Sequence, residues 1–252
     1  MPEPELPSGL EAMLAENRRL YRTLNHDVRA PLHAISSLTS MFSTNPSSFS
    51  EEELVEMATE IHRSVQGLNQ VVDGILRWMD YQAQRPQDSE RTALGVQLET
   101  AVNDAQVRAK QKEIQVFAEL DDELKNFALP DEFQICLGAL LDNAIKFSPR
   151  SGAVHILARK TGAGKSRGIR IQVLDSGSGV AERLQDDLFK LDKRVMAQGT
   201  EGERGAGMGL LMAADIMKRC NGSIGYEKTE QTCFFLELPE LKVGAPEAPV
   251  ER

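Results

Sequence analysis

Long apolar runs are missing from this chain of 252 residues. No stretch reaches the about 18 consecutive apolar residues that a membrane-spanning helix requires, so we expect no membrane span in this chain. The opening segment, Met1 to Glu5, also lacks the basic and apolar regions of a secretory signal peptide. We therefore expect a cytoplasmic location, with any membrane-bound sensor outside this chain.

The chain also contains few cysteines and fewer basic than acidic residues. The three cysteines, Cys136, Cys220 and Cys233, are far apart and form no C-x-x-C pair. Their number and spacing indicate reduced core residues in a cytosolic protein, and exclude a disulfide framework or a cysteine metal site. The net charge of −9, from 29 basic and 38 acidic residues, argues against nucleic acid as the main partner because phosphate backbones require a basic surface.

The remaining composition, 41% apolar and 27% charged, is that of a soluble globular protein with room for two domains. In the first part of the chain, apolar residues recur with a period of 3.5, which is typical of helices packed side by side. We expect one helix over residues 9–44 and a second that begins at a capping box formed by Ser50 and Glu53. The seam residues are Leu10, Leu24 and Leu38 with Leu14, Tyr21, Val28, Ile35 and Phe42, and then Leu54, Ile61, Leu68 and Ile75 with Ala58, Val65, Val72 and Met79.

Two helices that each carry such a seam cannot bury both seams within one hairpin. Two copies of the hairpin can bury them together in a four-helix bundle, which predicts a homodimer. The alternative is a monomeric hairpin that leans on the other domain. The seams run the full length of both helices, and this favours the dimer.

His26 lies off the first seam, between Leu24 and Val28, so its imidazole is expected to face solvent. The carboxylate of Asp27 can accept a hydrogen bond from Nδ1–H and leave Nε2 as a free nucleophile. Pro31 removes a backbone donor and presses on the carbonyl of Asp27, which predicts a bend beside the histidine. Taken alone, His26 is better explained as a solvated surface residue of a helical hairpin.

Beyond residue 92 the pattern changes to an α+β mixture, with helices on one face of a mixed sheet. The residues predict helices at 93–112, 130–147, 181–191 and 207–220, and strands at 115–120, 126–129, 153–159, 168–174, 223–227 and 232–238. The last two strands form a hairpin. The stretch 192–206 has no periodicity, and the chain contains no internal repeats.

Two motifs in this second part carry polar groups suited to a nucleotide. Asn143 and Lys146 share one face of a helix, where an amide oxygen can ligate Mg²⁺ and an ammonium can meet phosphate. Asp175 ends a strand and precedes Gly177 and Gly179, so its carboxylate can accept a hydrogen bond from an adenine amino group while the glycines admit the base. Each motif alone is also common on ordinary surfaces.

Two further features follow in the same order. Gly205, Gly207 and Gly209 run into Leu210 at the start of a helix, where backbone N–H groups favour anions. The pattern is neither a Walker loop, because no Gly-Lys-Ser/Thr follows, nor a Rossmann turn, because no strand leads into it. Thr232 begins the last strand, where its hydroxyl could support the adenine-binding aspartate.

Together, the His-Asp-x-Arg-x-Pro-Leu stretch and these motifs resemble the phospho-acceptor, N, first-glycine, F (Leu188-Phe189) and second-glycine boxes of two-component sensor histidine kinases. The ATP-binding part of that family is related to the ATPases of gyrase, a heat-shock chaperone and a mismatch-repair protein. The resemblance implies a dimeric helical hairpin followed by a Bergerat-type α/β sandwich that binds ATP and Mg²⁺, with 192–206 as a mobile lid. It implies that Asn143 binds Mg²⁺, Lys146 the phosphates, Phe147 the base edge and Asp175 adenine. The implied domains are 1–8, a disordered start; 9–85, the dimerisation and phosphotransfer hairpin; 86–92, a linker; 93–241, the catalytic domain; and 242–252, a disordered tail.

Three positions depart from the family pattern. Family members often carry Asn or Glu four residues before the magnesium asparagine, where this chain has Ala139, although Asp142 is a possible substitute. Many members have Thr or Asn four residues after the histidine to hold water for phosphatase chemistry, where this chain has Ala30. The glycines that usually precede the last threonine are Glu230 and Gln231.

The resulting prediction is a histidine kinase core that autophosphorylates His26 from ATP, with Asp27 as orienter or base, and passes the phosphoryl group to an aspartate of a response-regulator receiver. Weak phosphatase activity is expected because Ala30 cannot orient water. One alternative is a degenerate kinase or histidine phosphotransfer module that does not turn over ATP. A second is a conformational ATPase of the gyrase or chaperone kind, against which the His-Asp helix argues.

Overall fold

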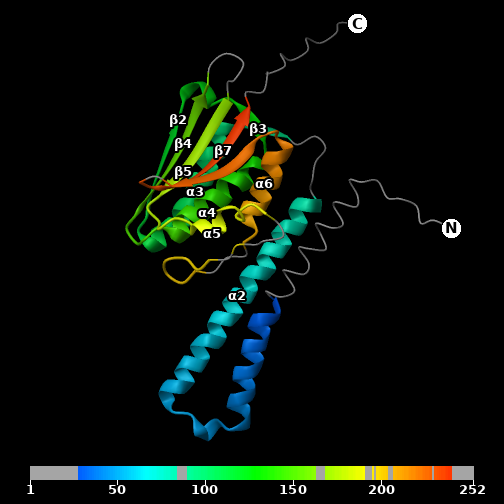
Figure 1. The fold of residues 1–252 in the computed structure, drawn as a ribbon, viewed down its shortest axis with the longest axis vertical. Coiled ribbons are helices and arrows are strands. Elements are labelled where there is room, and N and C mark those ends of the chain that lie inside the picture. Colours follow the sequence, from blue (N-terminus) through cyan, green and yellow to red (C-terminus); the bar gives the residue numbers. More distant parts are fainter. Residues whose placement is uncertain are drawn as a thin grey trace, which may run out of the picture. The chain divides into compact units, whose positions relative to one another are not determined.

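The structure is a computed structural model that describes residues 28–83, 90–162, 168–190, 195, 197–203, 207–228 and 230–239. The chain divides into two compact units, one formed by 1–87 with 180–211 and the other by 88–179 with 212–252. Figure 1 shows both units. The predicted domain boundaries at 85 and 93 stay predictions, although a helix that ends at Ala83 and a strand that begins at Arg91 flank them.

The first unit is built on a helical hairpin. Residues 28–44 are helical, a short 3₁₀ turn η1 (Pro46–Ser48) follows, and α2 (Glu51–Ala83) runs back beside the first helix (Figure 1). The predicted capping box is confirmed: Ser50 N–H donates to Glu53 Oε2 at 2.8 Å, and Glu53 N–H donates to Ser50 Oγ at 3.2 Å. The helix continues through Pro31. The predicted bend involves the carbonyl of Asp27, which lies outside the described residues.

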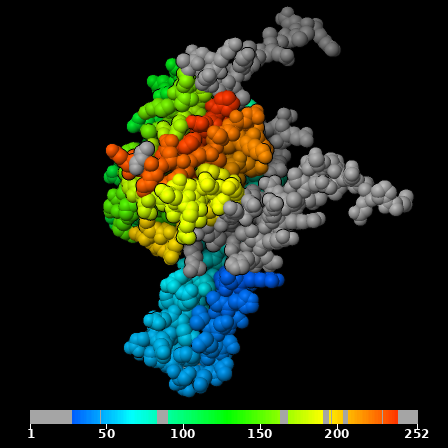
Figure 2. Space-filling model, in the orientation of Figure 1, coloured from blue at the N-terminus to red at the C-terminus, as the bar shows by residue number. Residues whose placement is uncertain are grey.

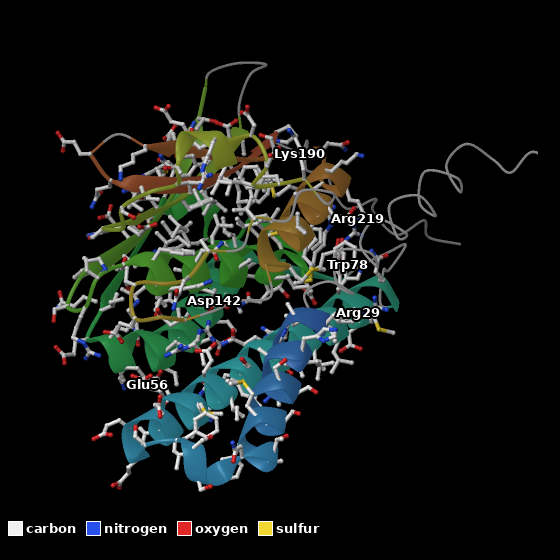
Figure 3. All side chains as sticks on the ribbon, turned by 60° about the horizontal axis from the view of Figure 1, so that its bottom comes forward. Arg29, Glu56, Trp78, Asp142, Lys190 and Arg219 are labelled. Carbon is white, nitrogen blue, oxygen red and sulfur yellow. The ribbon has the colours of Figure 1, made fainter. Side chains whose placement is uncertain are left out.

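The two predicted seam series of α2 differ in how deeply their side chains are buried. Leu54, Ile61, Leu68 and Ile75 are half-buried, whereas Val65, Val72 and Met79 are exposed. A third line, not predicted from the sequence, is buried and consists of Ser64, Val71 and Trp78, seven residues apart. The ring of Trp78, labelled in Figure 3, packs on Tyr81 with centroids 5.8 Å apart.

The second unit contains two sheets and the helices that cover the larger one. Its elements are β1 (Arg91–Ala93), α3 (Leu94–Ala109), η2 (Lys110–Lys112), β2 (Gln115–Leu120), η3 (Asp122–Leu124), β3 (Ala128–Pro130), α4 (Phe133–Phe147), β4 (Ala153–Thr161), β5 (Gly168–Asp175), β6 (Ser223–Lys228) and β7 (Thr232–Pro239). The helix α6 (Gly209–Arg219) enters it from the first unit. The five-stranded sheet has the order β2-β4-β5-β7-β6, and β1 pairs with β3 separately.

The large sheet is mixed, as predicted, because β2 and β4 are parallel while the other neighbours are antiparallel. The central strand β5 alternates strictly: Ile169, Ile171 and Val173 are buried, and the residues between them are only half-buried. The buried side faces α3, α4 and α6, which lie on one face of the sheet (Figure 1). The predicted fold class, a helical hairpin followed by an α/β sheet domain, is confirmed. The dimeric four-helix bundle stays a prediction.

The helix predicted over 181–191 is wrong in extent. Only α5 (Glu182–Gln185) is α-helical, and turns occupy the next four residues. The backbone bonds there join residues three apart, as from Asp187 N–H to Leu184 O at 3.1 Å and from Lys190 N–H to Asp187 O at 3.2 Å. Bonds of this kind close tight turns rather than an α-helix, so the helix is shorter than predicted.

Candidate nucleotide site

Asp175 is the last residue of β5 and the most deeply buried carboxylate among the described residues, with 1% of its surface exposed. Its Oδ1 accepts a hydrogen bond from Gly177 N–H at 2.7 Å, which folds the chain back immediately after the strand. Burial raises the pKa of Asp175 to about 6, although the Gly177 N–H bond and the charge of Lys228 both act to lower it. A buried strand-end carboxylate of this kind is suited to accept a hydrogen bond from a ligand.

Gly177 lies where no side chain fits. A Cβ at this position would stand 2.5 Å from Asp175 Oδ1 and 2.7 Å from the carbonyl oxygen of Phe147, the last residue of α4. Both distances are far below normal contact, so any larger residue would push the loop away from the carboxylate. Gly177 therefore brings the end of α4 and the end of β5 together at one place.

Thr232, at the start of β7, supports this loop from the neighbouring strand. The sheet register pairs it directly with Asp175, and its Oγ1 donates to the carbonyl of Gly177 at 3.1 Å. The sequence analysis predicted that this hydroxyl supports the adenine-binding aspartate. The structure shows that the hydroxyl contacts the loop backbone, so the support reaches the carboxylate through Gly177.

The predicted helix residues lie on α4. Asn143 and Lys146 are half-buried, and the Lys146 ammonium lies 4.8 Å from the centroid of the Phe147 ring. The buried Lys112 donates from Nζ to the carbonyls of Ile145 and Lys146, both at 3.0 Å. These bonds satisfy carbonyl groups at the end of α4 and place a cation near the negative end of its dipole, which fixes the segment that meets Gly177.

Asp142, considered above as a substitute for the missing polar residue at Ala139, has a partner on another helix. It projects from α4 (Figure 3), and its Oδ1 lies 2.6 Å from Arg108 Nη2 of α3. The ion pair ties the carboxylate to α3. Ala139, one turn before Asn143, contributes only a methyl group to its helix face.

The remaining predicted residues belong to the first unit or lie outside the described residues. Gly207 has a φ of +64°, a conformation that favours glycine, and Gly209 and Leu210 open α6; these three belong to the first unit. Three more predicted residues, Gly205, His26 and Asp27, lie outside the described residues. Their roles, like all site assignments from the sequence, stay predictions.

Sequence reasoning missed two residues of β6 that contact the loop. Gly179 has a φ of +81°, and a Cβ there would stand 2.6 Å from Lys228 Cδ and 2.8 Å from Tyr226 Oη. Figure 2 shows β6 in orange and β7 in red side by side at the surface. The sequence feature that could have indicated Lys228 is the predicted β6–β7 hairpin. Its three-residue connection places Lys228 directly opposite Thr232.

Comparison with known proteins shows what the chain is similar to. The family described as "Histidine kinase-, DNA gyrase B-, and HSP90-like ATPase" matches residues 128–242. Sensor histidine kinase GlrK of Escherichia coli is 22% identical over 94% of this chain and 49% of its own length. The family match over residues 128–242 and the similarity to GlrK support the predicted sensor histidine kinase catalytic core.

Two solved histidine kinase structures share the fold. Histidine kinase AdeS of Acinetobacter baumannii has a TM-score of 0.58 at 19% identity and covers 85% of this chain and 97% of its own. Histidine kinase ThkA, in complex with response regulator protein TrrA, has a TM-score of 0.64 at 16% identity and covers 94% of this chain and 68% of its own.

The chain spans between 21% and 49% of the length of the curated relatives that it matches first. Among its described helices, none is both long and apolar enough to cross a membrane.

Proposed function

We propose that the chain is an ATP-dependent protein-histidine kinase whose Asp175 binds adenine through a hydrogen bond. The observation that carries this proposal is the buried Asp175 carboxylate, held by Gly177 N–H at the end of β5. Among the described residues this is the carboxylate's one hydrogen bond, so its second oxygen can accept the exocyclic amino group of adenine. The absence of a side chain on Gly177 lets its backbone approach the Asp175 carboxylate and the end of α4 closely enough to hold that carboxylate in place.

The phosphate end of ATP is assigned to α4 and to the segment before α6. Asn143 offers one amide oxygen, and Mg²⁺ is commonly held by one or two protein oxygens together with substrate phosphates and water. Lys146, one turn further on, offers an ammonium to the phosphates. Gly205, Gly207, Gly209 and Leu210 provide backbone N–H groups at the start of α6. Bound Mg²⁺ would neutralise charge that develops on the transferred phosphoryl group.

In the proposed reaction, Nε2 of His26 attacks the γ-phosphorus in line with the bond to the β-phosphate oxygen. A nitrogen–phosphorus bond forms, the phosphorus–oxygen bond breaks, and ADP leaves. Asp27 accepts a hydrogen bond from Nδ1–H, orients the ring and stabilises the positive charge that the attack creates. The phosphoryl group then passes to a receiver aspartate, which regenerates the free imidazole.

Incubation of the chain with γ-labelled ATP and Mg²⁺ tests this function. We expect protein-bound label that acid removes and base does not, because a phosphoramidate has these stabilities and a serine or threonine ester does not. Label with the opposite stability, or bound nucleotide without any label, would contradict a histidine kinase.

A response-regulator receiver is the proposed partner. The support is the structural neighbour ThkA, which was solved in complex with response regulator protein TrrA. The phosphoryl transfer itself requires that the receiver dock on the hairpin near His26. Nucleic acid is not proposed as a partner, because the net charge is −9.

We predict weak phosphatase activity toward the phosphorylated receiver. Ala30 stands one helical turn beyond His26, is exposed, and has only a methyl group, whereas hydrolysis of an aspartyl phosphate requires a water held in line. An Ala30→Thr variant, which gains a hydroxyl, should release phosphate several times faster. The assay uses a receiver phosphorylated by this chain, with ADP and no ATP. Fast release by the wild type, with no gain from Ala30→Thr, would show that the water is held elsewhere.

A homodimer through the hairpin is also proposed, because one chain leaves an apolar stripe of α2 exposed. Val65, Val72, Leu76 and Met79 are between 39% and 58% exposed, and Phe42 of the first helix is 47% exposed. Their spacing of seven, four and three residues places the four α2 residues along one side of the helix. A second hairpin with the same stripe would cover them and complete a four-helix bundle.

Val72→Glu should therefore weaken dimerisation by at least about tenfold, since it places a charge in a seam that the dimer dehydrates. Gln66→Glu is the matched control, because Gln66 is also exposed but lies away from the apolar stripe. Sedimentation velocity over a concentration series measures both. A wild-type chain that stays monomeric at high micromolar concentration, or equal effects of the two variants, would refute the dimer.

One observation favours a second candidate function. Ala139 gives the Asn143 face of α4 no additional polar atom, and Asp142 is paired with Arg108, so a module that binds nucleotide without transferring phosphate remains the alternative. Nucleotide titration beside the labelling assay separates the two, because the module would bind ATP and incorporate no label.

A further inference from the structure

The hairpin end of β6 carries a lysine with no role in the reaction proposed above. The register pairs Lys228 with Thr232 and Thr232 with Asp175, so the three residues form one row across β6, β7 and β5. Side chains in one row of neighbouring strands lie on the same face of a sheet. Lys228 therefore lies on the face of the sheet that carries the Asp175 carboxylate.

The Lys228 ammonium contacts the backbone of the loop that follows Asp175. Its Nζ donates to the carbonyl of Ser178 and lies 3.5 Å from the carbonyl of Gly177. Its Cδ lies so close to Gly179 that a Cβ there would approach it to 2.6 Å. The loop is thus fixed at three points, by the Asp175 carboxylate, by the Thr232 hydroxyl and by the Lys228 ammonium.

We propose that Lys228 is a positioning residue of the nucleotide site, whose ammonium holds the 176–179 loop so that the Asp175 carboxylate faces adenine. This inference rests on the proposed ATP function and adds to it a residue that the sequence motifs do not contain. It also provides a way to position the loop without the glycines that usually precede the last threonine in the family, where this chain has Glu230 and Gln231. The short connection places Lys228 directly opposite Thr232, and both side chains then donate to the loop carbonyls.

The charge of Lys228 has a second effect, on the protonation of Asp175. Its positive charge lowers the pKa of that carboxyl against the larger effect of burial, which raises it. The other described neighbours are uncharged at this point: Val154 of β4 and Thr232 of β7 pair with Asp175, and α4 contributes the Phe147 carbonyl. Removal of the ammonium should therefore raise the pKa of Asp175 above about 6.

Calorimetric titration of the whole chain with Mg²⁺–ATP over roughly pH 5 to 8 tests the proposal. At the alkaline end we expect Lys228→Met to bind about three- to tenfold more weakly, because a charge-assisted but exposed contact is lost. The pH midpoint of binding should also move upward. Lys228→Arg, which keeps the charge and the donors, should restore both quantities toward the wild type. Lys160→Met, which removes an exposed lysine paired with Glu123, is the control and should change neither.

The pH midpoint of nucleotide binding distinguishes a residue that positions the loop through its charge from one with a merely structural role. A Lys228→Met variant that binds like the wild type overturns the proposal, and so does weaker binding with an unmoved midpoint that Lys228→Arg does not rescue. Failure of the proposed function gives a different result. In that case the wild-type chain itself binds no nucleotide, or binds it and gains no label.

Discussion

His26→Gln should abolish incorporation of label from γ-labelled ATP, to below about a hundredth of the wild-type level, because the amide has no nucleophilic nitrogen to replace Nε2. ATP binding should persist, since the proposed adenine residue, Asp175, is in the other unit of the chain. A loss of label with retained binding therefore identifies the acceptor and excludes a collapse of the nucleotide site. Binding is measured by titration and label by filter retention after base treatment.

The chain offers its own controls, because it contains four histidines. His33 follows His26 by seven residues, which is two helical turns, and is exposed, but Ala34 follows it instead of a carboxylate. His62 precedes Arg63, and His155 stacks on Phe117 with ring centroids 4.9 Å apart. The matched variant His33→Gln should retain full labelling. Equal labelling of His26→Gln and the wild type would move the acceptor to another residue.

Local sequence signals predicted much of the fold because they act over a few residues. The capping box at Ser50 and Glu53 and the β6–β7 hairpin both follow from neighbouring residues, and both are present. The same kind of reasoning overestimated the helix at 181–191, where the backbone forms tight turns after Gln185. Helix ends are the part of such a prediction that local residues determine least.

The burial of α2 shows a second limit. The sequence identified apolar positions at the correct period, but it could not show which of them face the inside of one chain. Val71 and Trp78 are buried while Val72 and Met79 are exposed, although each exposed residue directly follows a buried one. A rotation of the helix by one residue would exchange the two sets, and periodicity alone does not fix that rotation.

In the candidate site, the motifs located individual residues and missed their connections. Asp175, Gly177 and Thr232 were identified, and they contact one another. Lys112, which caps α4, and Lys228, which contacts the loop, belong to no motif, because the residues they contact are between 33 and 51 positions away in the chain. Such contacts depend on sheet order and helix placement, which a short motif does not contain.

Asp175→Asn should have two opposite effects at neutral pH: weaker ATP binding and a more stable fold. The amide oxygen can still accept the Gly177 N–H, but the charge that strengthens a hydrogen bond from adenine is lost. We expect ATP affinity to fall by a factor that corresponds to about 1–3 kcal/mol. Titration with Mg²⁺–ATP measures the loss, and an unchanged affinity would remove the adenine role of Asp175.

The gain in stability follows from the pKa of Asp175, which burial raises from 3.8 to about 6. Between these values the folded chain binds a proton that the unfolded chain has released, so the wild type loses stability as pH rises from about 4 to about 6. Above that range the buried charge has a constant cost of about 1–3 kcal/mol, which Asp175→Asn avoids. The variant should therefore unfold at higher urea concentration than the wild type at neutral pH, with little difference near pH 4. Asp122→Asn is the control, because Lys125 lowers the pKa of exposed Asp122 and its removal should give no gain. A stability difference for Asp175→Asn that does not change with pH would show that its carboxylate is not held as a buried charge.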